Sequence, residues 1–193
     1  MANRHEIEGL DFYERVGLVI RALFAIFKRE IDGLECKFVL GEVKTTSIKG
    51  EYHPFAIEEA WGYKELRKAV DPPPDAPRHV YITFSTFTSE EDKVSANGEG
   101  WIGVKVVLEN GTVTFTPLWG ADVTFREISE EGAKRRRIAE GMLGDETFSA
   151  DLDSGVDVYN ALKEAVRIAF NGVIQLLNNI WERAVEASAA LVT

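Results

Sequence analysis

The chain has 193 residues, 45% of them apolar and 28% charged, a composition that is ordinary for a globular domain and excludes disorder over the whole length. Its 22 basic and 32 acidic residues give a formal net charge of −10, which repels a phosphate backbone, so direct nucleic-acid binding is not expected. The most apolar stretch, residues 16–27, is interrupted by Arg21 and is shorter than the ~20 apolar residues that a bilayer span needs, so no membrane association is expected.

The only cysteine is Cys36, which excludes an intramolecular disulfide and fits a reducing compartment. Residues 1–9 lack the charged, apolar and small-residue order of a secretory signal. We therefore expect a soluble cytoplasmic protein, or a component of a particle assembled in the cytoplasm.

A long helix is predicted near the N-terminus. Asp11 and Glu14 have the spacing of a helix cap, and apolar residues then recur every three or four positions until Asp32-Gly33. Leu18 and Ile26 widen the apolar surface beyond the face that one sheet covers. This surplus predicts a second contact.

The next hundred residues are predicted to alternate between strands, loops and a short helix. We expect a strand at 36–48, a helix at 54–70, a rigid proline-rich loop at 71–77 and a strand at 79–88. The polar residues 89–100 are expected to form a mobile loop.

A β-hairpin at about 101–119 is the clearest local prediction. Apolar residues alternate before and after Asn110-Gly111, a pair that suits a tight turn because both central residues must take positive φ. Trp101 and Trp119 are expected to approach each other at the open end, either as core residues or as the lining of an apolar pocket.

Beyond the hairpin, Pro117 and Gly120 are expected to interrupt the return strand, which would continue over residues 123–128. A short polar helix is predicted from Ser129 to about Met142, followed by an acidic loop at 144–155.

The chain closes with a predicted helix from Asp157 to about Ala190, unless it breaks at Gly172 or Asn178-Asn179. Its apolar surface is wider than one stripe, because Ile168, Phe170, Ile174 and Trp181 lie partly outside it. The fold class is thus predicted as a single α+β domain over 1–193, an antiparallel sheet with a hairpin, packed by long N-terminal and C-terminal helices.

No constellation of residues predicts an enzyme, a cofactor or a metal. His5, His53 and His79 have no metal-ligand spacing, and glycine-rich phosphate loops and nucleophile elbows are absent. His53 near Glu58 and Glu59 is conceivable as a general base, but a surface histidine explains it as well.

The acidic loop offers alternating aspartates at 151 and 153, which is a calcium-binding pattern. The spacing departs from an EF-hand, and capping of the final helix by Asp153, Ser154 and Asp157 explains the same residues.

These patterns favour a non-enzymatic subunit that assembles with itself or with other protein subunits. The basic run at Arg135–Arg137 of one copy could meet the acidic loop of the next. The interface candidates are Leu18, Ile26, Ile168, Phe170, Ile174, Trp181, Arg135, Arg136, Arg137, Asp151 and Asp153.

Compact α+β subunits with an opening helix and a hairpin occur in tailed-virus neck and tail assemblies, a likeness of architecture that no motif supports. The alternative is a module that binds an apolar small molecule, because a sheet gripping a long C-terminal helix resembles helix-grip domains.

Overall fold

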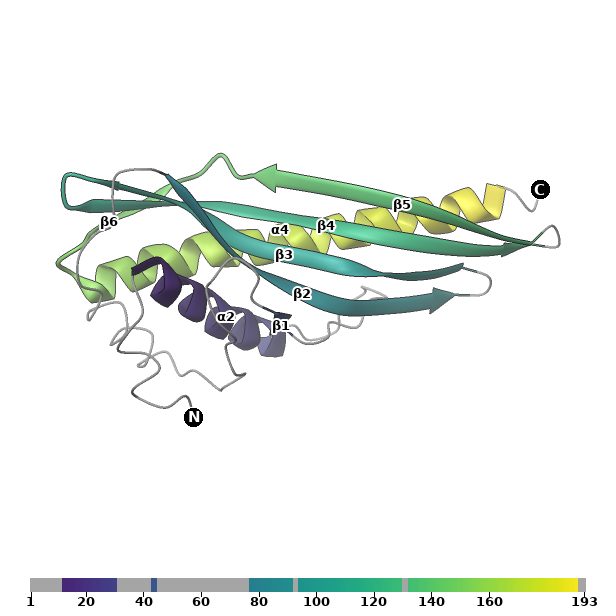
Figure 1. The fold of residues 1–193 in the computed structure, drawn as a ribbon, viewed down its shortest axis with the longest axis horizontal. Helices are drawn as coiled ribbons and strands as arrows, with labels where there is room; N and C mark the ends of the chain where they lie inside the picture. Colours follow the sequence, from purple (N-terminus) through teal and green to yellow (C-terminus); the bar gives the residue numbers. More distant parts are fainter. Residues whose placement is uncertain (1–11, 31–42, 45–76, 92–93, 130–131, 191–193) are drawn as a thin grey trace.

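The computed structural model describes residues 12–30, 43–44, 77–91, 94–129 and 132–190. In chain order the elements are α2 (Phe12–Glu30), β1 (Val43–Lys44), β2 (Arg78–Glu91), β3 (Val94–Glu109), β4 (Thr112–Ser129), β5 (Gly132–Leu143), β6 (Phe148–Asp151) and α4 (Gly155–Ala190). Figure 1 shows an elongated molecule in which α4 runs along the sheet and α2 lies beside the N-terminal half of α4. The α+β class is confirmed, since the described residues form an open antiparallel sheet and two helices.

The strands follow the order β1-β2-β3-β4-β5, and every neighbouring pair is antiparallel. β6 also pairs with β4, on the edge that β5 occupies further along. The segment predicted as an acidic loop at 144–155 is therefore partly wrong, because residues 148–151 form a strand. β4 has partners on both of its sides along nearly its whole length.

β4 continues without a break through Pro117 and Gly120, so the predicted interruption is wrong. The Gly144 amide donates to the Pro117 carbonyl at 2.7 Å, which shows that the backbone of Pro117 faces the gap between β5 and β6. The proline nitrogen, which carries no hydrogen, therefore sits where a ladder bond to β3 is not required.

β2 reaches Glu91 and β3 begins at Val94, so the mobile loop predicted at 89–100 is wrong for residues 89–91 and 94–100, which the structure describes as strand. Val94 and Ala96 are buried, whereas Asn97 is exposed, as alternation along a strand requires. Gly100 pairs directly with Phe84, and a Cβ on Gly100 would lie 2.3 Å from the Phe84 ring. The glycine makes room for an aromatic side chain on the neighbouring strand.

The polar helix predicted from Ser129 to Met142 is also wrong, because Ser129 ends β4 and residues 132–142 lie in strand β5. It pairs with β4 from Ser129↔Gly132 to Leu118↔Leu143. The twelve residues gain an inter-strand ladder along β4, and this tertiary pairing overrides a local sequence that lacks apolar alternation.

The hairpin between β3 and β4 is confirmed, with Asn110 at φ 49° and Gly111 at φ 75° in its two-residue turn. The predicted approach of Trp101 and Trp119 is wrong, because the register pairs Trp101 with Gly120 and Ile102 with Trp119. Neighbouring residues of a strand point to opposite faces, so the two indoles lie on opposite sides of the sheet.

α4 is one continuous helix of 36 residues, and neither Gly172 nor Asn178-Asn179 breaks it. Ser154 caps its start, since the Asp157 amide donates to the Ser154 hydroxyl at 3.4 Å. Between α4, α2 and the sheet, Phe24 stacks on Phe84 with ring centroids 5.1 Å apart and meets Phe170 edge-on at 5.6 Å. These three rings join α2, β2 and α4 in one core.

Several predictions lie outside the described residues. They concern Cys36, His5, His53, the helix at 54–70, most of the strand at 36–48 and most of the loop at 71–77.

Candidate interaction surface

The apolar helical residues that were expected to meet a partner are largely covered within the chain. Leu18, Phe170 and Trp181 have exposed fractions of only 1%, 3% and 4% and offer no surface. Ile26 and Ile174 are half-buried and pack against the core, and Ile168 is also half-buried. Any larger contact surface in the described part of the chain has to be sought on the sheet.

The basic run lies on β5, where its side chains alternate between the two faces of the sheet. Arg136 pairs with the buried Phe125 and therefore points to the side that carries α4, whereas Arg135 and Arg137 point to the other side. All three arginines are exposed.

Arg137 forms a two-pronged contact with Asp122 of β4. Its Nε donates to one carboxylate oxygen at 2.8 Å and its Nη2 to the other at 2.6 Å. The hydrogen bond from Arg137 holds the pKa of Asp122 below its usual value, and the same contact raises the pKa of Arg137. This arginine is therefore already paired inside the chain.

The acidic candidates lie far from the basic run. Asp151 pairs with Thr112 at the beginning of β4, whereas Arg135 pairs with Arg126 near its end. An extended strand rises about 3.3 Å per residue, which separates the two sites by about 45 Å. Asp151 and Asp153, both exposed, therefore meet the basic run only if a second copy supplies one of the two.

β5 is the edge of the sheet, and no strand among the described residues pairs with its outer side. The Gly144 amide bonds the Pro117 carbonyl, so Gly144 directs its backbone groups toward β4. Backbone direction alternates from one residue to the next along a strand, so the even-numbered residues of β5 also direct their backbone groups to β4. The odd-numbered residues, from Arg135 to Leu143, direct theirs outward. Met142 and Leu143 at the end of this strand are 59% and 48% exposed.

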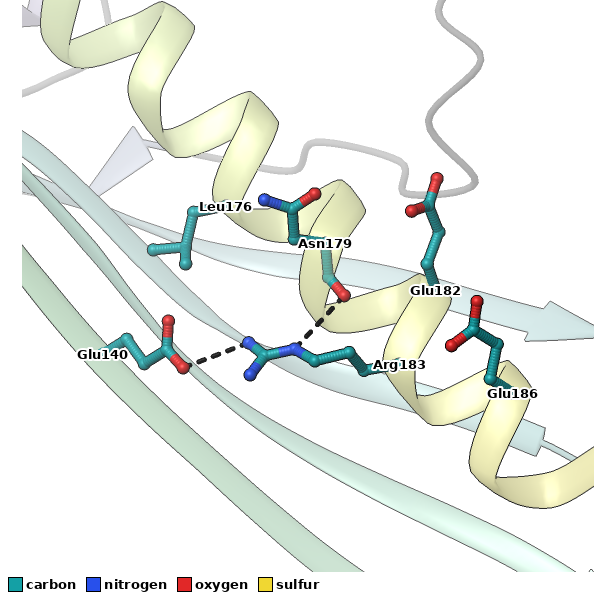
Figure 2. A pocket seen from close by; sticks show the side chains of 6 residues that line it. All are labelled: Glu140, Leu176, Asn179, Glu182, Arg183 and Glu186. Atoms are coloured by element: carbon teal, nitrogen blue, oxygen red, sulfur yellow. Dashed lines mark hydrogen bonds and ion pairs between the residues drawn. The ribbon is translucent and has the colours of Figure 1, made fainter. Parts of the chain in front are cut away.

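A groove of about 360 Å³ separates β5 from the C-terminal half of α4. Its lining residues are Glu140, Leu176, Asn179, Glu182, Arg183 and Glu186. Figure 2 shows Arg183 reaching from α4 toward β5, where its Nη2 donates to Glu140 at 3.0 Å. The Nε of Arg183 also donates to the Asn179 carbonyl at 3.4 Å. Glu140 thus pairs with Arg183, and two further carboxylates, Glu182 and Glu186, line the same groove.

The sequence does not indicate the edge or the groove, because its local pattern in this segment predicts a polar helix. Met142-Leu143, two large apolar residues between glycines in a polar run, was the one local signal of an exposed contact.

Within the described ranges, no three residues of the His, Cys, Asp and Glu types lie close enough together to hold a metal ion. His79 is exposed at the start of β2. Neither described helix combines the length and apolarity needed to cross a bilayer.

Comparison with protein families, with curated proteins and with solved structures finds no match to this chain.

Proposed function

We propose that this protein is a non-enzymatic subunit that assembles with copies of itself or with other protein subunits, through the outer edge of β5. The observation that carries the proposal is a twelve-residue edge strand whose outer side pairs with no strand among the described residues, and which ends in exposed Met142 and Leu143. Such an edge is a template for another strand. The neck or tail of a tailed virus is one setting for such a subunit.

The distribution of charge along β5 supports this use of the edge. Natural proteins protect exposed edges by placing charged side chains along them. Here the charges are concentrated at Lys134–Arg137, whereas Ile138–Leu143 carries one charged residue, Glu140. Half of the edge is therefore left without that protection.

The alternative of a module for an apolar ligand has weaker support. α4 does lie along the sheet, as in that reading, but Phe115, Leu162 and Val166 are fully buried between the two. The groove beside α4 is lined mainly by charged and polar groups. Between α4 and the sheet, an apolar molecule would have to displace these described core side chains.

Sedimentation velocity over a wide concentration range tests the proposal. We expect an oligomer of defined size, which Leu143→Lys weakens because it places a charge on the exposed end of the edge. Val156→Lys is the matched control, since Val156 is a similarly exposed apolar residue, 41%, on α4 and away from β5. A wild-type protein that stays monomeric at every concentration, with no partner subunit captured on β5, would remove the proposal.

A further inference from the structure

We propose that two copies pair through β5, antiparallel and about a two-fold axis at Ile138, so that the two sheets become one. This inference rests on the proposed function and specifies its occupant as a second copy. It follows from the backbone direction of β5, from its order of charges and from the groove beside it.

The backbone of β5 permits this pairing. A two-fold axis perpendicular to the sheet keeps the same face upward in both copies, so paired positions must point to the same side. With Ile138 on the axis, Arg137 lies opposite Ala139 of the partner subunit and Arg135 lies opposite the partner's Gly141. These are odd-numbered positions, whose amides and carbonyls face outward, so they form the hydrogen-bonded pairs.

Charge selects this register among its neighbours. An axis at Ile138 places Arg136 opposite the partner's Glu140, and the symmetry makes the same contact a second time. An axis at Arg136 or Arg137 would set an arginine opposite its own copy, which is repulsive. An axis at Ala139 would place Glu140 opposite the partner's Ile138 and leave the carboxylate without a cation across the edge. The basic half of each strand therefore meets the acidic and apolar half of the other.

The charges that line the groove also favour a contact between Arg136 and the partner's Glu140. Glu140 opens into a space that also holds Glu182 and Glu186 of α4, and Arg183 is the one cation of its lining. Arg136 points to this side of the sheet and makes no ion pair with any described residue. In the paired dimer the partner's Arg136 lies next to Glu140, where it adds positive charge to an acidic groove.

Cysteine cross-linking at the axis tests the register. In a Cys36→Ser background, Ile138→Cys places two thiols at a non-hydrogen-bonded pair, where Cα atoms lie about 4.5 Å apart and a disulfide can close. We expect a disulfide-linked dimer under mild oxidation at concentrations at which the wild type is oligomeric. Ala139→Cys is the control, because it faces the partner's Arg137 and its own copy lies beyond the ~7 Å that a disulfide spans.

Charge reversal tests the contact across the edge. Arg136→Glu turns two attractive pairs into two repulsive ones, so the Kd of the dimer should rise roughly tenfold. Arg135→Glu, equally exposed on the same strand but opposite the partner's Gly141, should change the Kd far less. Circular dichroism of each variant checks that the fold is kept, and Arg136→Gln, which only removes the charge, should give an intermediate Kd.

The outcomes separate this inference from the proposed function. If the wild type assembles but Ala139→Cys cross-links as well as Ile138→Cys, or if both charge reversals weaken it equally, the two-fold pairing is wrong while assembly stands. Capture of a different protein on β5 by a monomeric chain also overturns the pairing and leaves the broader proposal. A chain that neither self-associates nor binds a partner overturns both.

Discussion

The indole ring of Trp119 lies against Gly172, near the middle of α4, so closely that a Cβ on Gly172 would stand 2.4 Å from the ring. Glycine inside a helix costs about 1 kcal/mol relative to alanine, so its presence here needs a compensating reason. The contact supplies it, because it lets α4 lie directly on a large side chain of β4. The residue that resembled a helix breaker in the sequence is a point of close packing.

Gly172→Ala should therefore destabilise the protein, although alanine favours the helix. Overpacking costs about 1–3 kcal/mol, which exceeds the gain in helix propensity. A lower urea midpoint with an unchanged slope would report this loss. Gln175→Ala, at an exposed position one turn along the helix, should keep the midpoint, and a Gly172→Ala variant as stable as the wild type would contradict the tight packing.

Gly111→Ala should destabilise the hairpin between β3 and β4 for a purely conformational reason. A Cβ at Gly111 would have no atom within 4 Å, yet φ is +75°, a region that costs an L side chain about 1–2 kcal/mol. Asn110→Gly is the control, because glycine also accepts positive φ and should change the free energy of unfolding by only a few tenths of a kcal/mol. Equal urea midpoints for the two variants would contradict the turn geometry.

Arg137→Gln should raise the pKa of Asp122 toward the ordinary aspartate value of about 3.9. In the wild type, the hydrogen bond from Arg137 lowers the folded-state pKa of Asp122. The ion pair therefore contributes stability above the unfolded-state pKa, and this contribution is lost as the pH falls through the folded-state pKa. An NMR titration of the Asp122 carboxyl carbon measures the shift. Arg135→Gln should leave the titration curve unchanged.

Phe24→Ala should be among the most damaging single changes, with a cost of about 3–5 kcal/mol. Phe24 is fully buried and its ring contacts both Phe84 and Phe170, so its removal opens a cavity where α2, β2 and α4 meet. Thermal unfolding followed by circular dichroism measures the loss. Arg29→Ala, exposed on α2, should shift Tm little. A Tm for Phe24→Ala close to that of the wild type would mean that α2 does not depend on this ring.

The elements that the sequence predicted well are those whose signal is local. The Asn110-Gly111 turn and the apolar periodicities of α2 and α4 are set by backbone conformation and by one buried face, both visible in a short window. The register of a two-residue turn also fixes the faces of Trp101 and Trp119. Their predicted contact is wrong because pairing counted outward from the turn sets Trp101 opposite Gly120 and Trp119 opposite Ile102.

β5 could not be recognised in this way, because its character depends on its neighbours. As an edge strand it has one face in solvent and its other face partly beyond α4, so Arg136 and Glu140 stand where a central strand would have apolar residues. The candidate site shares this difficulty. The groove exists only because Arg183 of α4 reaches Glu140 of β5, 43 positions earlier in the chain.

The prediction of a loop at residues 89–100 is wrong for a related reason. Gly98 and Gly100 are loop signals in isolation, but Gly100 lies beneath Phe84 of the adjacent strand. Glycine in that position serves the packing of a residue 16 places away, which no local window contains.

The position of α4 in the chain has a consequence for biosynthesis. When the ribosome has completed β6, every described strand exists but α4, the helix that covers the apolar face of β3 and β4, including Val104 and Phe115, has yet to be translated. Until α4 is synthesised, that apolar face of the nascent sheet is exposed, a state that favours chaperone binding or aggregation. Premature termination before Gly155 would thus release an aggregation-prone fragment, and completion of α4 is the step that buries the exposed apolar side chains.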